Sequence, residues 1–129
     1  MRLLLDTHVL VWWLKDNPKL GPRPRALIAN GSVEVFFSVV SCWEASIKHR
    51  AGKFELPGSE LFRMASGAGL GFVGIESSHF AHLEDLPKIA KHGDPFDHLL
   101  IAQTLAESAA LMTADRQMPQ YGIRCIGVR

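Results

Sequence analysis

The sequence is poor in cysteine, with only Cys42 and Cys125 among its 129 residues. Two cysteines without a secretory leader favour reduced thiols, which excludes a disulfide-stapled scaffold. No apolar run approaches the ~18–20 residues that a membrane span needs. The amino-terminal apolar run contains three leucines and ends at Asp6, unlike a signal peptide. We therefore expect a cytoplasmic protein without membrane attachment.

The sequence also has almost no net charge, since 14 basic and 13 acidic side chains leave +1. Bulk charge therefore neither supports nor excludes a nucleic-acid substrate, and local basic residues or bound cations would have to offset phosphate charge. The hydrophobic share of 47% argues against disorder. A chain of this length fits one domain, which we expect to span residues 1–129.

Several enzyme and metal-site motifs are missing. There is no Gly-x-Ser-x-Gly sequence, and Gly67, Gly69 and Gly71 lack the lysine and the following helix of a phosphate-binding loop. His79 and His82 share a predicted helix, but no third ligand stands at zinc-site spacing. We therefore expect these histidines to lie on a solvated helix face.

Alternating short strands and helices organise the chain. Apolar or β-branched runs predict five strands, at residues 3–5, 33–38, 72–75, 110–113 and 123–126. Helical spacing and capping signals predict six helices, at residues 7–15, 24–30, 42–51, 59–67, 78–86 and 95–108. Strands separated by helices require crossovers, so we expect an α/β fold with a central parallel sheet and helices on both faces.

The three tryptophans, Trp12, Trp13 and Trp43, are expected to lie mostly in the core. The first predicted helix is apolar on more than one face, which leaves part of it available for an interface.

Acidic side chains stand at corresponding places along the predicted elements. Asp6 and Asp115 follow the first and fourth strands, and Glu44 lies in the first turn of the helix after the second. In an open parallel sheet, ligands bind beyond the carboxyl ends of the strands, so these three acids should meet there. Asp97 begins the helix before the fourth strand, and we expect it to join them only if the loop at residues 87–93 returns the chain to that edge.

Converging carboxylates need a counter-charge, because without one they repel and some take up protons at neutral pH. Mg²⁺ prefers oxygen ligands and commonly uses one or two carboxylates. Such an ion activates water and stabilises the charge that develops in phosphodiester hydrolysis.

Each acid also has a local role to weigh. Asp94 before Pro95 fits a helix N-cap, and Asp97 would then favour the helix dipole. Ser41 and Glu44 match a capping box. The other two acids are ordinary turn formers. Taken singly, these local roles are at least as good an explanation as catalysis.

Four sequence blocks distinguish better between local capping roles for these acids and a shared metal site. They are LLLDTHVLVW at residues 3–12, SVVSCWEASIK at 38–48, HGDPFDHLLIAQ at 92–103 and LMTAD at 111–115. In this order and spacing they resemble the PIN domain, specifically the VapC-like toxin component of type II VapBC toxin–antitoxin systems. The resemblance covers about residues 2–124.

The resemblance implies a three-layer α/β/α sandwich and a ribonuclease that depends on Mg²⁺ or Mn²⁺. It implies that Asp6 and Asp97 bind the metal, and that Glu44 and Asp115 contact it directly or through water. It also implies that Asp97 does reach the shared pocket. The supporting positions are Thr7, Asp94 and Thr113.

The expected partners are RNA, a second copy of the chain and a cognate antitoxin. Lys48 either pairs with Glu44 one turn away or meets an RNA phosphate, and Arg116 and His98 are further candidates for RNA contact. The family often has basic residues where Gly93 and His98 stand, which weakens the case for those positions. We expect the antitoxin to dock near the first helices and insert a basic side chain at the acids.

Two other functions remain open. A haloacid-dehalogenase-like phosphatase would use Asp6 as nucleophile, but its motif needs an aspartate where His8 stands. A non-catalytic RNA- or protein-binding module would not favour clustered acids, because carboxylates repel phosphates unless a cation intervenes.

Overall fold

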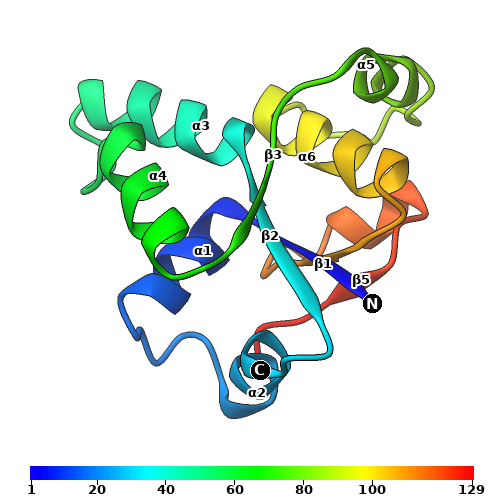
Figure 1. Ribbon diagram of the computed structural model, residues 1–129. Helices are drawn as coiled ribbons and strands as arrows, with labels where there is room; N and C mark the ends of the chain where they lie inside the picture. Colours follow the sequence, from blue (N-terminus) through cyan, green and yellow to red (C-terminus); the bar gives the residue numbers. More distant parts are fainter.

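The computed structural model describes residues 1–129 and contains one sheet of five parallel strands, in the order β3-β2-β1-β4-β5 (Figure 1). The predicted α/β class and the five-stranded parallel sheet are confirmed. The strands are β1 (Arg2–Leu5), β2 (Glu34–Ser38), β3 (Gly71–Val73), β4 (Ala110–Met112) and β5 (Cys125–Ile126).

Six helices connect the strands, as the sequence predicted. They are α1 (Thr7–Leu14), α2 (Pro22–Ala29), α3 (Val39–Arg50), α4 (Gly58–Gly67), α5 (Ser77–Glu84) and α6 (Pro95–Ala106), with a short 3₁₀ turn at Met118–Tyr121. None of them combines the length and the apolar character that crossing a bilayer requires.

The alternation of side chains along β1 divides the core in two. Leu3 and Leu5 pack with α1, α2 and α4 on one face, whereas Leu4 packs with the apolar side chains of α6, such as Leu100, on the other. Both groups are fully buried, so the sheet is covered on both faces. The result is the three-layer α/β/α sandwich seen in Figure 1.

The start of α3 differs from the prediction and removes the capping box. The helix begins at Val39, and its N-cap is Ser38, whose hydroxyl accepts a hydrogen bond from the amide of Val40 at 3.0 Å. Ser41 and Glu44 therefore lie inside the helix, where both are buried. Their polar groups are free for tertiary contacts because they do not cap the helix.

The expectation for His79 is also wrong, since its side chain is 0% exposed. Glu76 caps α5, and its backbone amide donates to His79 Nδ1 at 3.0 Å. The other ring nitrogen, Nε2, donates to Glu107 at 3.1 Å. Both nitrogens are thus used in joining α5 to the end of α6, whereas His82 is solvent-exposed as expected.

The tryptophans contribute less to the core than expected. Trp43 is 48% exposed and packs edge-on against Phe96 of α6, with ring centroids 4.9 Å apart. Trp12 and Trp13 are half-buried beside the core on the α1 face.

Both cysteines are free thiols, as the sequence predicted. Burial raises the pKa of Cys42 to about 11 and also raises that of Cys125. Neither forms a thiolate readily at neutral pH, so neither has the character of a nucleophile.

Candidate active site

A cavity of about 300 Å³ opens at the carboxyl ends of β1 and β4, and all four predicted acids line it. We call it the acid pocket. Its full lining is Asp6, Thr7, His8, Val9, Trp12, Glu44, Lys48, Asp94, Asp97, Ala114 and Asp115. The lining comes from strand ends and helix starts far apart in sequence, as expected at this edge of a parallel sheet.

Asp6 is held between two strands and a helix. Its backbone amide donates to the carbonyl of Met112 at 3.0 Å, continuing the ladder between β1 and β4. One carboxylate oxygen accepts from the amide of Thr7 at 2.8 Å, and the other accepts from the hydroxyl of Thr113 at 2.6 Å. Burial raises the pKa of Asp6 even though these bonds act in the opposite direction.

Glu44 enters the acid pocket from α3 and is only 4% exposed. Its Oε1 accepts from the hydroxyl of Thr7 at 2.7 Å, and Thr7 Oγ1 also lies 2.9 Å from Ser41 Oγ. Its Oε2 accepts from Lys48 Nζ at 2.5 Å. The sequence left two roles open for Lys48, and the structure shows the local ion pair at the wall of the acid pocket.

The pKa of Lys48 is raised. Burial alone would lower it, but its hydrogen bond with Glu44 and the charges of Glu44, Asp94 and Asp97 act more strongly in combination. Lys48 therefore stays protonated at the wall of the acid pocket and supplies one fixed positive charge there.

Asp97 reaches the acid pocket because α5 and α6 pack side by side in opposite directions. His79 at the start of α5 contacts Glu107 just after α6, so the end of α5 lies toward the start of α6. The sequence analysis expected the loop at residues 87–93 to bring the chain back to the carboxyl edge of the sheet. In the structure, α5 runs toward that edge and covers most of the distance. Asp97 then stands in the first turn of α6, facing the other acids.

Asp94 caps α6, as its position before Pro95 predicted. Its Oδ1 accepts from the amides of Phe96 at 2.8 Å and Asp97 at 3.4 Å. It also lines the acid pocket, so one carboxylate stabilises the helix start and adds negative charge to the site.

The acid pocket disfavours full ionisation of its own carboxylates. Burial first, and then the charges of Asp6, Asp94 and Glu44, raise the pKa of Asp97 to about 7. Burial and the neighbouring negative charges favour the protonated form of Asp97, and a bound cation would lower its pKa again.

Asp115 is oriented by a histidine that the sequence analysis did not select. Its Oδ2 lies 3.0 Å from His92 Nε2, and its Oδ1 accepts from the amide of Gln117 at 2.8 Å. His92 Nε2 is also 3.5 Å from Asp97 Oδ2, and its Nδ1 is 2.7 Å from the hydroxyl of Tyr121. His92 thus links two acids of the site to the turn that contains Tyr121.

The only signal for His92 in the sequence was its place at the head of the third block. A histidine in a glycine-containing loop has no periodicity that would predict burial, and its partners come from distant segments.

Burial, and then the charges of Asp97 and Asp115, raise the pKa of Tyr121. Its hydroxyl therefore remains protonated beside the imidazole.

The three candidates for RNA contact lie in different places. Lys48 lines the acid pocket, whereas Arg116 lines a larger cavity that adjoins it. His98 turns away from the acids, with its Nε2 2.7 Å from the carbonyl of His92 and 3.2 Å from the hydroxyl of Tyr121. His98 therefore supports the loop before α6 and does not line the acid pocket.

The donor set of the acid pocket suits a hard divalent cation. His92, Asp97 and Asp115 each present one possible ligand atom within 4.8 Å of the others, and Asp6 and Glu44 add carboxylate oxygens. Oxygen donors with a net negative charge match Mg²⁺ and Mn²⁺ better than softer metals.

Replacing Asp94 separates its capping role from its electrostatic role. We expect Asp94→Ala to destabilise the protein by about 1 kcal/mol, because two amides of the first turn lose their acceptor. Asp94→Asn keeps an acceptor and should stay close to the unmodified stability in urea unfolding. An equal loss of stability in both variants would show that the negative charge of Asp94 stabilises the protein more than its hydrogen bonds to the helix start do.

The comparisons with known proteins agree with this geometry. The model of the PIN domain family matches residues 3–123 of the chain. No curated protein matches it significantly. Among solved structures, the chain is similar to one from the VapBC2 complex of Rickettsia felis bound to a promoter DNA fragment, with a TM-score of 0.72, 14% identity and 98% of both chains covered.

Two further solved structures have the same fold. One is the DNA-bound VapBC complex of Salmonella typhimurium, with a TM-score of 0.70, 16% identity and coverage of 100% of this chain and 99% of that one. The other is VapBC-1 of nontypeable Haemophilus influenzae, with a TM-score of 0.69, 17% identity and 98% of both chains covered. At these identities the likeness establishes the arrangement of the backbone.

Proposed function

Because the chain belongs to the PIN domain family, we propose that it is a metal-dependent endoribonuclease that acts as the toxin of a toxin–antitoxin pair. The observation that carries the proposal is the meeting of Asp6, Glu44, Asp97 and Asp115 in one cavity of about 300 Å³. Without a cation, burial and mutual repulsion make the ionised form of such carboxylates unfavourable, as the raised pKa of Asp97 indicates.

In this proposal Asp6 and Asp97 bind Mg²⁺ or Mn²⁺, and Glu44 and Asp115 contact it directly or through water. When bound, such an ion supplies Lewis-acid polarisation of a phosphate and an activated water for phosphodiester hydrolysis.

The remaining groups of the site orient these ligands. Thr7 and Thr113 hold Glu44 and Asp6 through the hydroxyl contacts described above, and such supporting hydrogen bonds keep ligand oxygens in place. Lys48 keeps one positive charge at the wall of the acid pocket, where it would attract a phosphate oxygen.

The alternative functions fit the site less well. Both oxygens of Asp6 already accept hydrogen bonds, and the position that a haloacid-dehalogenase-like phosphatase needs for an aspartate is His8. A binding module without catalysis gives no reason for five carboxylates in one small cavity.

The proposed partners follow from the family and from the exposed apolar side chains. The solved structures of similar fold come from VapBC complexes, and we propose that this chain likewise binds a cognate antitoxin in the cytoplasm. We also propose a homodimer. Trp43 and Ile47, each 48% exposed on α3, offer apolar surface for one of these contacts.

The direct test uses purified protein and a structured RNA in the presence of Mg²⁺ or Mn²⁺. We expect internal cleavage that EDTA abolishes and that added metal restores. A DNA strand of the same sequence serves as the second substrate and should remain intact. Undiminished cleavage in EDTA would contradict the proposal.

Melting experiments test the metal independently of cleavage. We expect Mg²⁺ to raise the melting temperature by mass action, and to raise it more at pH 8 than at pH 6. The reason is that the pKa of Asp97 is about 7, so protons compete with the metal below that pH.

The matched control for this experiment is Glu84→Gln, which removes an exposed carboxylate on α5 outside the acid pocket. It should keep the full Mg²⁺-dependent shift, whereas Asp97→Asn should reduce it. An equal shift at both pH values and in all three proteins would remove Asp97 from the ligand set.

A further inference from the structure

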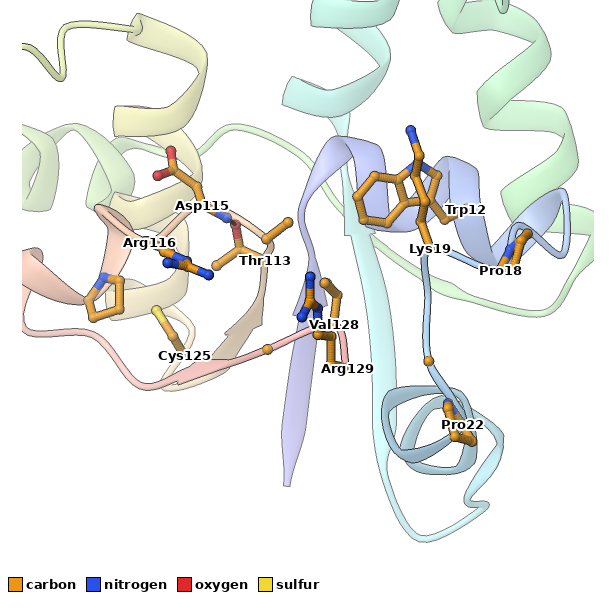
Figure 2. A pocket seen from close by; sticks show the side chains of 14 residues that line it. Trp12, Pro18, Lys19, Pro22, Thr113, Asp115, Arg116, Cys125, Val128 and Arg129 are labelled. Atoms are coloured by element: carbon orange, nitrogen blue, oxygen red, sulfur yellow. Dashed lines mark hydrogen bonds between the residues drawn. The ribbon is translucent and has the colours of Figure 1, made fainter.

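A second cavity of about 950 Å³ lies beside the acid pocket. We call it the basic groove, because Lys19, Arg116 and Arg129 line it. Figure 2 shows Trp12, Lys19 and Pro22 on one side, Thr113 and Arg116 on the other, and Arg129 between them. Segments near both ends of the chain thus form a single concave surface.

The basic groove and the acid pocket adjoin each other. Trp12, Ala114 and Asp115 line both cavities. A chain-like ligand lying in the basic groove could therefore continue past Asp115 to the other acids without leaving the surface. The volume is in the range that encloses an entire small ligand, so several units of such a chain have room.

The charge of the basic groove selects an anionic ligand. Lys19, Arg116 and Arg129 are exposed, and none of them has a carboxylate within 4.0 Å. The only acidic side chain in the lining is Asp115, which also belongs to the acid pocket and already faces His92. The basic groove therefore presents three cationic side chains without carboxylate partners, one of which, Lys19, lies over the Trp12 ring, directly beside the negatively charged acid pocket.

The backbone of the basic groove is fixed by contacts between distant segments. The amide of Gly21 donates to the carbonyl of Val128 at 2.7 Å, which ties the loop after Lys19 to the residues that follow β5. A Cβ at Gly21 would approach the Cα of Arg129 to 3.1 Å, so a side chain there would crowd these residues. The amide of Thr113 similarly donates to the carbonyl of Ile126 at 3.0 Å.

We propose that the basic groove binds the backbone of single-stranded RNA on one side of the phosphate that enters the acid pocket. Lys19, Arg116 and Arg129 contact successive phosphates. Trp12 lines the junction with the acid pocket, and the Lys19 ammonium lies over its ring, 5.8 Å from the centroid. The inference rests on the proposed ribonuclease function and adds the path of the substrate.

An antitoxin segment is the competing occupant. Such a segment is expected to bring a basic side chain to the acids, and the three cations of the basic groove would repel that side chain along this path. RNA suits both surfaces. Its phosphates are attracted directly to the cations of the basic groove, and a bound metal ion can join a phosphate to the carboxylates of the acid pocket.

The test measures binding and cleavage of a fluorescently labelled 12-nucleotide RNA in Mg²⁺. Lys19→Glu, Arg116→Glu and Arg129→Glu are made singly and together, and Lys88→Glu applies the same charge change at an exposed site that lines neither cavity. We expect the triple variant to raise Kd and KM by tenfold or more while kcat changes little.

The salt dependence gives a second readout that a folding defect would not produce. The slope of log Kd against log salt should fall by about 2 in the triple variant, since each lost single-strand phosphate contact contributes about 0.7. Arg116→Lys keeps the charge and should recover most of the affinity of Arg116→Glu. Lys88→Glu should match the unmodified protein.

The outcomes separate this inference from the proposed function. Unchanged RNA affinity and salt slope in the triple variant would overturn the basic groove as the RNA path and favour a protein segment there. If the unmodified protein binds RNA through these residues but never cleaves it, the proposed function fails and the inference stands. RNA that does not bind to the unmodified protein would contradict both.

Discussion

Asp97→Asn should lower RNA cleavage by about 100-fold or more while leaving the protein folded. Metal-ion polarisation contributes several kcal/mol to such reactions, and each 1.36 kcal/mol is about a tenfold change in rate. Asn keeps the volume of the side chain but removes the charge that would hold the ion. Gel assays of a labelled RNA, with Mg²⁺ in excess, measure the loss.

The same substitution should stabilise the metal-free protein at alkaline pH. The pKa of Asp97 is 3.8 in the absence of perturbation and about 7 in the folded protein, so the folded state binds the proton more tightly. The free energy of unfolding therefore falls as pH rises from about 4 to about 7 and stays low above that range. Asn removes this loss, which is on the order of 4 kcal/mol at pH 8.

Urea unfolding at pH 5 and pH 8 in EDTA checks this expectation. Asp97→Asn should flatten the pH dependence, and Glu84→Gln, the exposed control on α5, should follow the unmodified protein. Full cleavage activity in Asp97→Asn, or a stability that still falls between the two pH values, would contradict the role assigned to this carboxylate.

Gly58→Ala should be the most damaging small substitution outside the site. Gly58 begins α4 against α3, where an added Cβ would lie 2.0 Å from the carbonyl oxygen of Cys42 and 2.2 Å from Ser46 Oγ. Its amide also donates to Ser46 Oγ at 3.0 Å, so the two helices cannot separate without losing that bond. We expect a destabilisation of about 2–3 kcal/mol from overpacking.

The effect of Gly58→Ala should extend to the acid pocket, because α3 carries Glu44 and Lys48. Gly67→Ala is the matched control in the same helix, since a Cβ there meets nothing within 4 Å. That change should be neutral or stabilising by about 0.5 kcal/mol, as is usual for glycine replaced in a helix. Identical thermal melts for both variants would contradict the close approach of α3 and α4.

Local chemistry along the chain was sufficient to predict the strands, the helices and the parallel sheet. Leu3, Leu4 and Leu5 form a short apolar run that favours a strand covered on both faces, and Asp94 before Pro95 predicts the start of α6. These features depend on neighbours within a few residues, so they are readable without coordinates. The position of Asp6 and Asp115 after strands placed them at one edge for the same reason.

The contacts of distant side chains could not be read in this way. Ser41 and Glu44 fit a capping box by spacing, yet packing starts α3 three residues earlier and turns Glu44 toward Thr7. Likewise, nothing near His79 in sequence indicates Glu107, with which its ring makes a buried contact.

The site itself combines both kinds of information. The chain order supplies the acids and their strand ends, but the ionisation of Asp97 and the orientation of Asp115 by His92 exist only once α6 packs beside β1 and β4. The basic groove is a further case, since Lys19 and Arg129 are separated by almost the whole chain. Burial and charge at such places depend on which surfaces meet, and packing free energy, unlike local backbone preference, is set by the entire fold.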